Sequence, residues 1–552
     1  MRGEHRRPAS GPAGGTRPGR RTWPAFVGAF ALFFIVIGLW SLSTPLLGGA
    51  DEPVHVIKAA AVARGQLTGR LIGGSGGPNG YERVPSFYAS VGGTPICYAA
   101  RPTVSASCAT TPAGGSNLVD VEVYNARYPP LYYAIVGLPT LVTASVTGLD
   151  LMRLVSAALS ALFLALAFWA VVKWSRSRFL LAGVLVAATP AALFFGGVVN
   201  PSGLEITVAI CVWTAGLVLV LEHLDDPPPG LVALVAASTG VELLLRSLSP
   251  LWVALIGVAL LAVADWTRLR GFVRRRSVLF GLGAIVACGV VAAAWIFGEH
   301  ALNVLPPRKA YPPSVPRSKI LSDAFDRTSM YWDQMISTVD WLQVNSPTFV
   351  GVAWAGLLGF LCIFAGAVSN LRRAVVLALL IVAVVVIPVV ILFTQARHVS
   401  LVWQGKDTMP LAVGVPLLAA ALIDRALRGR RGGLRDPEPA VASALGGRTR
   451  RMVGIVAAVA ALGELVTFWG MLRRNAVGTL GPNLDIFHSS WRPPLGVAGL
   501  LVLEAAGVAA LAVWVTVWAG APVPVRPVAD ETPVAVETPV REAADVPGAH
   551  GA

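Results

Sequence analysis

Two adjacent carboxylates and a histidine follow the first long apolar run of the sequence, residues 23–42. They lie in Asp51–His55, which reads Asp-Glu-Pro-Val-His. A carboxylate held partly desolvated at a membrane surface could act as a general base toward an acceptor hydroxyl. With its neighbours it could equally help to bind a divalent cation. Because proline favours the first turn of a helix, Asp51 could also be the N-cap of a helix over residues 53–64. That structural role is compatible with the chemical ones.

Charged residues inside apolar runs form a second group of candidates, because charge is costly in lipid and tends to be kept for function. Glu242 and Arg246 are four residues apart in one predicted helix, with the glutamate first, the favourable order for an ion pair. They could neutralise each other in a structural pair, or Arg246 could contact a lipid-linked phosphate. Arg153, at the start of its run, allows the same two interpretations. Glu205, at a predicted helix start, would complement the helix dipole.

The sequence has five cysteines, and two of them share one long polar segment. Cys97 and Cys108 are expected to form a disulfide, because redox conditions outside the cytoplasmic membrane permit one. The other three lie in apolar runs and are interpreted as packing residues. No cysteine and histidine spacing is typical of a zinc site, and no glycine-rich phosphate loop follows a strand-like segment. ATP hydrolysis is therefore not expected.

The elements that must position these candidates are transmembrane helices. The chain of 552 residues is 55% hydrophobic and only 13% charged, whereas soluble domains carry about 25% charged residues. Its apolar runs are close to the roughly 20 residues that cross the hydrocarbon core as a helix. Since every backbone polar group must be satisfied inside lipid, we expect an all-α, polytopic transmembrane helical bundle.

About twelve spans are predicted. They cover residues 23–42, 151–172, 179–199, 204–222, 230–248, 250–266, 278–298, 347–368, 375–393, 410–424, 452–471 and 495–519. Residues 128–146 are moderately apolar but contain two prolines and polar interruptions, so they are expected to form an interfacial or re-entrant segment.

More than half of the 44 Lys and Arg residues fall in the segments that this topology places on one side, which the positive-inside rule makes cytoplasmic. We therefore expect a multi-pass protein of the cell membrane with both termini in the cytoplasm and large extracytoplasmic loops at 43–150 and 299–346. The formal charge of +14 then reflects orientation and contact with the lipid bilayer, and it does not indicate a nucleic-acid partner.

Three regions follow from this topology. Residues 1–22 are expected to be a disordered, basic cytoplasmic segment, and residues 520–552 a disordered cytoplasmic tail, because neither has apolar periodicity. Residues 23–519 form the transmembrane domain.

Four short motifs resemble a family of uncharacterised bacterial membrane proteins that is grouped with the GT-C glycosyltransferases. They are Asp51–His55, Tyr128–Tyr133 (Tyr-Pro-Pro-Leu-Tyr-Tyr), Asn200-Pro201 and Gln404–Lys406 (Gln-Gly-Lys). The resemblance extends over roughly residues 20–515. GT-C enzymes use polyprenyl-phosphate sugars, and the acidic pair in their first outer loop is their hallmark. The resemblance therefore implies a GT-C-like bundle with a large first extracytoplasmic loop.

The resemblance also implies roles for individual residues. Asp51 would be the catalytic base, supported by Glu52 and His55. Basic residues would stabilise the phosphate leaving group. The residues expected to bind substrate are Tyr128, Tyr132, Arg153, Arg246, Gln404 and Lys406.

The sequence departs from the family pattern at two places. Ser202 stands where members tend to have Asp after Asn-Pro, and Lys406-Asp407 stands where they tend to have Arg-Tyr. Lysine holds phosphate as a point charge rather than as a bidentate fork, and Asp407 would weaken the positive potential beside it. Both departures put donor binding in doubt.

The expected function is a membrane glycosyltransferase that moves a sugar from a polyprenyl-phosphate donor to a cell-envelope glycan or protein acceptor. A divalent cation, Mg²⁺ or Mn²⁺, is one candidate cofactor, although no residue is assigned to a metal. A non-catalytic assembly or scaffold protein of the same fold is one alternative. The other is a secondary transporter, in which Glu242, Arg246 and Glu464 would line a path near the middle of the membrane.

Overall fold

The computed structural model describes residues 22–521, apart from 73–78, 176–177, 223, 225, 303–309 and 430–438. The two segments for which disorder is expected, 1–22 and 520–552, lie outside the described residues except for residues 22, 520 and 521. The described chain is mostly helical, as the sequence predicts.

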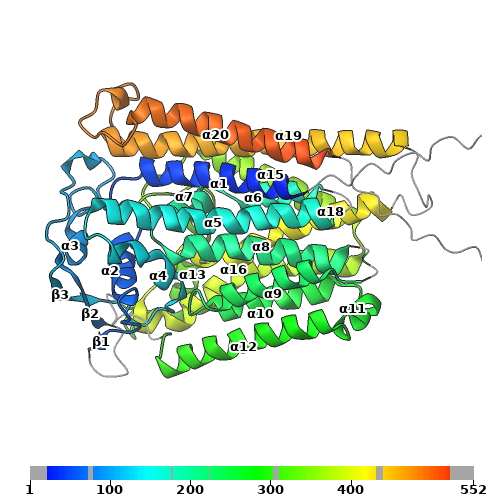
Figure 1. Ribbon diagram of the computed structural model, residues 1–552, viewed down its shortest axis with the longest axis horizontal. Helices are drawn as coiled ribbons and strands as arrows, with labels where there is room; N and C mark the ends of the chain where they lie inside the picture. Colours follow the sequence, from blue (N-terminus) through cyan, green and yellow to red (C-terminus); the bar gives the residue numbers. More distant parts are fainter. Residues whose placement is uncertain are drawn as a thin grey trace, which may run out of the picture. The chain divides into compact units, whose positions relative to one another are not determined.

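Long apolar helices dominate the described part of the chain (Figure 1). Nine are long and apolar enough to cross a membrane: α1 (Trp23–Ser43), α5 (Val146–Trp174), α8 (Pro201–Leu221), α12 (Arg276–Gly298), α15 (Thr348–Val368), α16 (Leu371–Val399), α17 with α18 (Met409–Ala412 and Gly414–Gly429), α19 (Pro439–Val477) and α20 (Gly496–Ala519).

Two further pairs of apolar helices are each bent sharply at a short break. The helices α6 (Leu180–Ala187) and α7 (Pro190–Gly197) meet at 61°. Pro190 cannot donate a backbone hydrogen bond to α6, so it begins a new helix, and the side chain of Thr189 accepts from Ala192 N–H as its N-cap. The helices α10 (Ser249–Val263) and α11 (Trp266–Val273) meet at 119°.

The predicted count of twelve spans is not confirmed, because the described residues give nine, or up to eleven with the bent pairs. The difference lies at the predicted span 230–248. There the helix α9 (Pro229–Leu243) has only 15 residues, which is about 22 Å at 1.5 Å per residue, against a hydrocarbon core of about 30 Å. It begins at Pro229, the last residue of a run of prolines, and ends at Leu243, because the backbone of Leu244 leaves the helical region.

Residues 44–145 contain a small sheet that the all-α prediction does not include. Strands β1 (Arg70–Leu71), β2 (Gly80–Pro85) and β3 (Leu118–Val123) pair antiparallel in that order. Short helices accompany them: α2 (Glu52–Val62), α3 (Ser86–Ala89), η2 (Val91–Gly93), η3 (Ala106–Cys108), α4 (Leu131–Val136) and η4 (Leu138–Leu141). The segment 128–146 is therefore not a span, as predicted.

A buried ion pair joins the sheet to α2. Lys58 Nζ lies 2.9 Å from Glu82 Oε1 and also donates to the carbonyl oxygens of Leu67 and Ala126. Both charged side chains are fully buried, so each depends on the other for its charge compensation. The position of α2, and of the residues just before it, is fixed by this network.

The long connections lie at one end of the helices, which we call the Asp51 end (Figure 1). They are residues 44–145, 299–347, 400–408 and 478–495, and they include α13 (Arg317–Asp326), α14 (Thr328–Ile336), η5 (Gly405–Asp407) and η6 (Asp485–Phe487). Lys406 contacts Asp51, and the backbone N–H of Thr479 donates to the carbonyl of Pro102. Residues that are hundreds of positions apart in sequence thus meet at this end.

The helix α8 follows α7 through a very tight connection beside the candidate site. A Cβ on Gly203 would lie 2.1 Å from the carbonyl oxygen of Phe195, so only glycine fits there. Asn200 caps α8 by accepting from Ser202 N–H and donates its own amide to the carbonyl of Ala50. The Asn200-Pro201 motif therefore anchors the backbone next to Asp51 and does not present a side chain to a ligand.

Candidate active site

Asp51 lies in the short turn between α1 and α2 with a left-handed backbone conformation, φ 63°. Aspartate tolerates this region better than most residues. Asp51 occupies the N-cap position of α2, but its side chain makes no capping hydrogen bond. The sequence left that structural role open, and the structure directs the carboxylate elsewhere.

The Asp51 carboxylate is shared between a lysine and a tyrosine. Lys406 Nζ donates to Oδ2 at 3.0 Å, and Tyr124 Oη donates to Oδ1 at 3.1 Å. Burial raises the pKa of Asp51, but the charge of Lys406 and these two hydrogen bonds outweigh it and lower the pKa to about 2. The Asp51 side chain is 32% exposed and that of Lys406 only 5%. The carboxylate is therefore ionised and partly open, while the ammonium group behind it is enclosed.

Lys406 is held by η5, which is itself tied to α14. The side chain of Asp407 accepts from the backbone N–H of Gln404, and Gly405 N–H donates to Gln334 Oε1 at 2.7 Å. A Cβ on Gly405 would come within 2.6 Å of the Cβ of Gln334, so the close approach requires glycine. The Gln404–Lys406 motif thus fixes the loop, and Lys406 is its contribution to the site.

Arg246 forms a second charged centre with two carboxylates. Its Nη1 lies 3.0 Å from Asp407 Oδ1 and 3.1 Å from Glu205 Oε2, and Ser249 donates to Glu205 Oε1. The Arg246 side chain is 17% exposed. Asp407, which pairs with Arg246, follows Lys406 directly in the sequence. The cationic side chains of Lys406 and Arg246 therefore lie in neighbouring parts of one site.

The predicted pair between Glu242 and Arg246 is wrong. The helix α9 ends at Leu243, so the two residues are not on one helical face. Arg246 turns to Glu205 and Asp407 instead, and both Glu242 oxygens lack a hydrogen-bond partner among the described residues. Glu205, near the start of α8, is fully buried in the ion pair with Arg246.

Glu52 and Arg153 form a buried, bidentate salt bridge. Nε and Nη2 of Arg153 donate to the two carboxylate oxygens, each at 2.7 Å. Backbone N–H groups of Gly49 and Val199 donate to the same carboxylate. The remaining Arg153 donors reach backbone carbonyls of the α1–α2 connection. Both side chains are thereby satisfied and enclosed, which places them under the site as support and not in contact with a substrate.

Aromatic residues line the other side of the Asp51 turn. His55 is buried, with Nδ1 2.8 Å from Tyr133 Oη, and burial lowers its pKa to about 3, so the ring is uncharged at neutral pH. Tyr128 lies beside His55 and is partly exposed. Tyr132 is fully buried and bonded to Ser156. Of the predicted tyrosines, Tyr128 is accessible to a ligand and Tyr132 is not.

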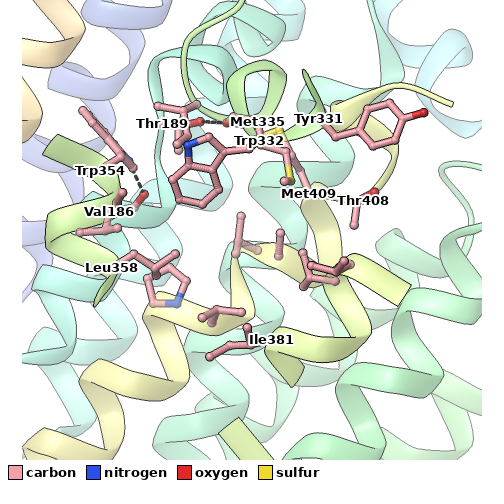
Figure 2. A pocket seen from close by; sticks show the side chains of 18 of the residues that line it. Val186, Thr189, Tyr331, Trp332, Met335, Trp354, Leu358, Ile381, Thr408 and Met409 are labelled. Atoms are coloured by element: carbon pink, nitrogen blue, oxygen red, sulfur yellow. Dashed lines mark hydrogen bonds between the residues drawn. The ribbon is translucent and has the colours of Figure 1, made fainter. Parts of the chain in front are cut away.

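An apolar cavity of ≈ 580 Å³ adjoins the other side of the η5 loop (Figure 2). It lies between α15 and α16, with α6, α17 and α18 behind it. Thr408 and Met409, which follow η5, line it together with Trp332 and Met335 of α14. The hydroxyl of Tyr331, on the same helix, has no partner among the described residues. The cavity can accept a hydrocarbon chain, and sequence reasoning did not predict it.

The described residues do not fit a divalent cation held by protein side chains. No three of the types His, Cys, Asp and Glu come together within the described ranges as metal ligands would. Asp51 faces Lys406 and Asp407 faces Arg246, so the carboxylates of the site are already neutralised by cations.

The predicted disulfide between Cys97 and Cys108 is present, with Cα atoms 6.1 Å apart. Its loop lies against the end of α19. Arg474 of α19 donates to the carbonyls of Tyr98 and Arg101 and pairs with Asp340 at 3.0 Å. The disulfide loop therefore belongs to the support of the Asp51 end.

One family of predicted membrane proteins and two solved structures are similar to this chain. No curated protein matches the chain. Two crystal structures of ArnT from Cupriavidus metallidurans are similar to it. The one bound to undecaprenyl phosphate has 15% identity, a TM-score of 0.40, and coverage of 90% of this chain and 76% of that chain. The apo structure has 14% identity, a TM-score of 0.43, and coverage of 91% and 77%. The model of DUF2142, described as a predicted membrane protein family, matches residues 33–415. Since that match covers more than half of the sequence, the chain belongs to the DUF2142 family of predicted membrane proteins.

Proposed function

We propose that this protein transfers a sugar from a polyprenyl-phosphate donor to a hydroxyl of a cell-envelope glycan or protein at the Asp51 end. One observation carries the proposal. A partly open carboxylate, Asp51, is held by a lysine that lies 355 residues away in sequence. A base for the acceptor and a cation for the phosphate therefore meet at one point. The Asp51–His55 and Gln404–Lys406 motifs resemble a family that is grouped with the GT-C enzymes, and the acidic pair is the hallmark of those enzymes, which supports the same chemistry.

In the proposed reaction, the acceptor hydroxyl gives its proton to Asp51 while its oxygen forms a bond to the anomeric carbon of the sugar. The bond between that carbon and the phosphate oxygen breaks, and the polyprenyl phosphate leaves with the electron pair. Lys406 and Arg246 stabilise the charge on the leaving phosphate. Tyr128 and Gln404, both partly exposed, are proposed to line the donor site.

Donor binding must first displace carboxylates, because both cations are already paired. A phosphate that takes Lys406 removes from Asp51 the partner that lowers its pKa to about 2. The pKa of Asp51 then rises, and the carboxylate becomes a stronger base. The donor would thus activate the base when it binds, and the resting site would avoid unpaired buried charge.

The apolar cavity beside η5 is proposed to hold part of the prenyl chain. Thr408, two residues after Lys406, is one of its lining residues. The membrane-facing helices α15 and α16 border the cavity, which suits a ligand that arrives from the bilayer.

A non-catalytic assembly protein is the second candidate function. It is favoured by Asp407, which neutralises Arg246 where family members tend to have tyrosine. The transporter alternative has less support. It needs Glu464 on one path with Arg246, yet Glu464 of α19 bonds to Trp40 of α1, whereas Arg246 contacts α8 and η5.

Two measurements on the Asp51→Asn variant separate these functions. Transfer is assayed with membranes and a panel of radiolabelled polyprenyl-phosphate sugars, and binding with a polyprenyl phosphate added to the purified protein. We expect transfer to fall about 10²–10⁴-fold, the usual contribution of a general base. We expect binding to persist or tighten, because the variant leaves Lys406 unpaired.

Asp323→Asn is the matched control, because Asp323 lies at the Asp51 end but pairs with Lys319 instead. Its transfer and binding should both equal those of the wild type. Full transfer by Asp51→Asn would disprove the role of Asp51. Binding without transfer in the wild type, across the whole panel, would favour the assembly protein.

A further inference from the structure

Two carboxyl groups lie buried on the α19–α20 hairpin, away from the candidate active site. Glu464 of α19 is 4% exposed and Glu504 of α20 is fully buried. They are close enough to interact electrostatically. The hairpin follows residue 415, where the family model ends, so no property of the family assigns a role to this pair.

The pair has very few hydrogen-bond partners. Trp40 of α1 donates its indole N–H to Glu464 Oε1. Glu464 Oε2 and both oxygens of Glu504 have no partner among the described residues. Ionised carboxylates in this state would be far more costly than neutral ones.

Among the described residues, no base on the main neighbouring helices lies close to the pair. The helices that pack against the hairpin, α1, α6, α7 and α15, contain no Lys, Arg or His, and α20 carries Glu504 as its only charged group. The short helices η3 and η6 contribute one titratable group, Asp485, and no base. On α19 the nearest base to Glu464 is Arg473, nine residues away, which is about 13 Å along the axis.

A small cavity of ≈ 40 Å³ opens against Glu464. It is lined by α1, α6, α7, α19 and α20, and Glu464 is its only charged lining residue. A volume of this size exceeds the roughly 10–15 Å³ that one water molecule needs. The Glu464 side chain therefore borders a space large enough for one water molecule.

We propose that Glu464 and Glu504 form a proton-binding site within the membrane, with both carboxyl groups protonated at neutral pH. Each protonated carboxyl can donate its O–H, to the other carboxyl or to a water in the cavity, and this satisfies the oxygens that are otherwise unpartnered. The site takes protons as its ligand and is independent of the proposed transferase chemistry.

Carbodiimide labelling tests the protonation state directly. A protonated carboxyl transfers its proton to a carbodiimide nitrogen while its oxygen adds to the central carbon, and the adduct then rearranges to a stable N-acylurea. The membrane-soluble dicyclohexylcarbodiimide is applied to the full chain in membranes near pH 7. Trypsin cleavage after Arg451 and Arg473 releases a peptide in which Glu464 is the only carboxyl side chain.

We expect a mass adduct on Glu464, Glu504 or both. Glu52 is the internal control, because it is equally buried but ion-paired with Arg153, so it should remain unlabelled in the same digest. The result that overturns the proposal is the absence of an adduct on both residues, or equal labelling of Glu52.

The Glu464→Gln/Glu504→Gln variant provides a second measurement. Glutamine resembles a protonated carboxyl in size and hydrogen bonding, so the variant should unfold at the same temperature as the wild type near pH 7. The infrared carbonyl band of buried protonated carboxyl groups should be weaker in the variant than in the wild type, which a difference spectrum of the two proteins shows. An unchanged band would contradict the proposal. If the variant fails to fold, the labelling of the wild-type chain still decides.

Discussion

Asp51 and Glu52 are adjacent in sequence but have opposite surroundings. Asp51 is partly exposed and accepts from Lys406 and Tyr124, whereas Glu52 is enclosed by a bidentate arginine and two backbone N–H groups. The difference arises from the turn before α2, which directs one side chain toward η5 and the other toward α5. Asp51 is therefore the carboxylate available for chemistry, and Glu52 is the one that supports its position.

These different surroundings predict that Glu52→Gln and Asp51→Asn lower the free energy of unfolding by different amounts. Glu52→Gln leaves Arg153 as an uncompensated buried charge and should lower the free energy of unfolding by about 3–5 kcal/mol. Asp51→Asn should change stability less, because the Asp51 side chain is 32% exposed and the introduced amide oxygen can still accept from Lys406. Thermal unfolding in detergent compares them, with Glu122→Gln as an exposed control. Equal stability of Glu52→Gln and wild type would contradict the supporting role.

The low pKa of Asp51 predicts that kcat/KM does not decrease through protonation of Asp51 as the pH falls below neutrality. Because its folded pKa is about 2, below the ordinary value of 3.8, Asp51 remains ionised as pH falls. Its contribution to stability is present above the unfolded value and disappears only as pH falls through about 2. We expect kcat/KM to show no loss from Asp51 protonation between about pH 5 and pH 8.

Lys406→Met should alter that profile in a defined direction. Without the lysine charge, burial of Asp51 dominates, so its pKa rises and the acid loss of kcat/KM moves to higher pH. Donor binding should weaken as well. Lys319→Met is the matched control, since Lys319 lies on the exposed surface of α13. An acid limb that is the same in wild type and Lys406→Met would refute the coupling.

The sequence could identify Asp51 and Lys406 because short motifs surround them. It could not identify Tyr124, which follows β3 and lies in no motif. It also paired Arg246 with Glu242 by helical spacing, and that failed because α9 ends three residues before Arg246. A spacing of four residues predicts that two side chains are neighbours only if the helix continues through both residues. The spacing does not show that α9 ends at Leu243.

At the level of elements, hydropathy predicted most spans but not their breaks. The bend between α6 and α7 occurs inside one apolar run, where Thr189 and Pro190 start a new helix. The sheet β1–β3 was not predicted because its strands are short and lie in a polar segment. In both cases, local hydrogen bonding by a few residues overrides the average apolarity of a window.

The disulfide loop and α19 form a clamp at the Asp51 end. Arg474 is buried among backbone carbonyls of residues 98–104 and pairs with Asp340 of the connection after α14. Arg473 and Arg474 conflict with the positive-inside rule in the predicted topology. The structure explains Arg474, because its charge is compensated inside the protein and is not exposed to a membrane surface.

This clamp predicts a loss of stability on reduction. Cys97→Ser/Cys108→Ser should lower the free energy of unfolding by about 2–3 kcal/mol, as expected for a loop of this length. Chemical unfolding of the purified protein measures it. Adding a reductant to the wild type should produce the same loss, whereas the double variant should not respond to it. A reductant effect that persists in the double variant would place the cause outside this disulfide.

At the scale of the whole protein, the four long connections share one end, and the basic helix α11 lies beyond the opposite end of α10. Because the connections at the Asp51 end must all face the same side of the membrane, the location of one of them gives the orientation of the whole protein. The positive-inside bias predicts that this side is extracytoplasmic, which is also where polyprenyl-phosphate donors of the proposed kind would be used.

Cysteine accessibility in intact cells tests the orientation. The chain is first prepared with serine at Cys211, Cys288 and Cys362, which are the free cysteines among the described residues. Ser322→Cys reports on the Asp51 end, since Ser322 is exposed on α13. Gly271→Cys reports on the opposite end, since Gly271 is exposed on α11 and a Cβ there meets no neighbouring atom.

A membrane-impermeant maleimide should label Ser322→Cys in intact cells and Gly271→Cys only after permeabilisation. The reverse pattern would show that the Asp51 end faces the cytoplasm. In that case the general base and Lys406 would still meet, but the acceptor would have to be cytoplasmic. The proposed transfer to a cell-envelope acceptor would then be wrong even though the site geometry is unchanged. Chemistry at the Asp51 end and the side on which it takes place are thus separate claims, and this labelling tests the second alone.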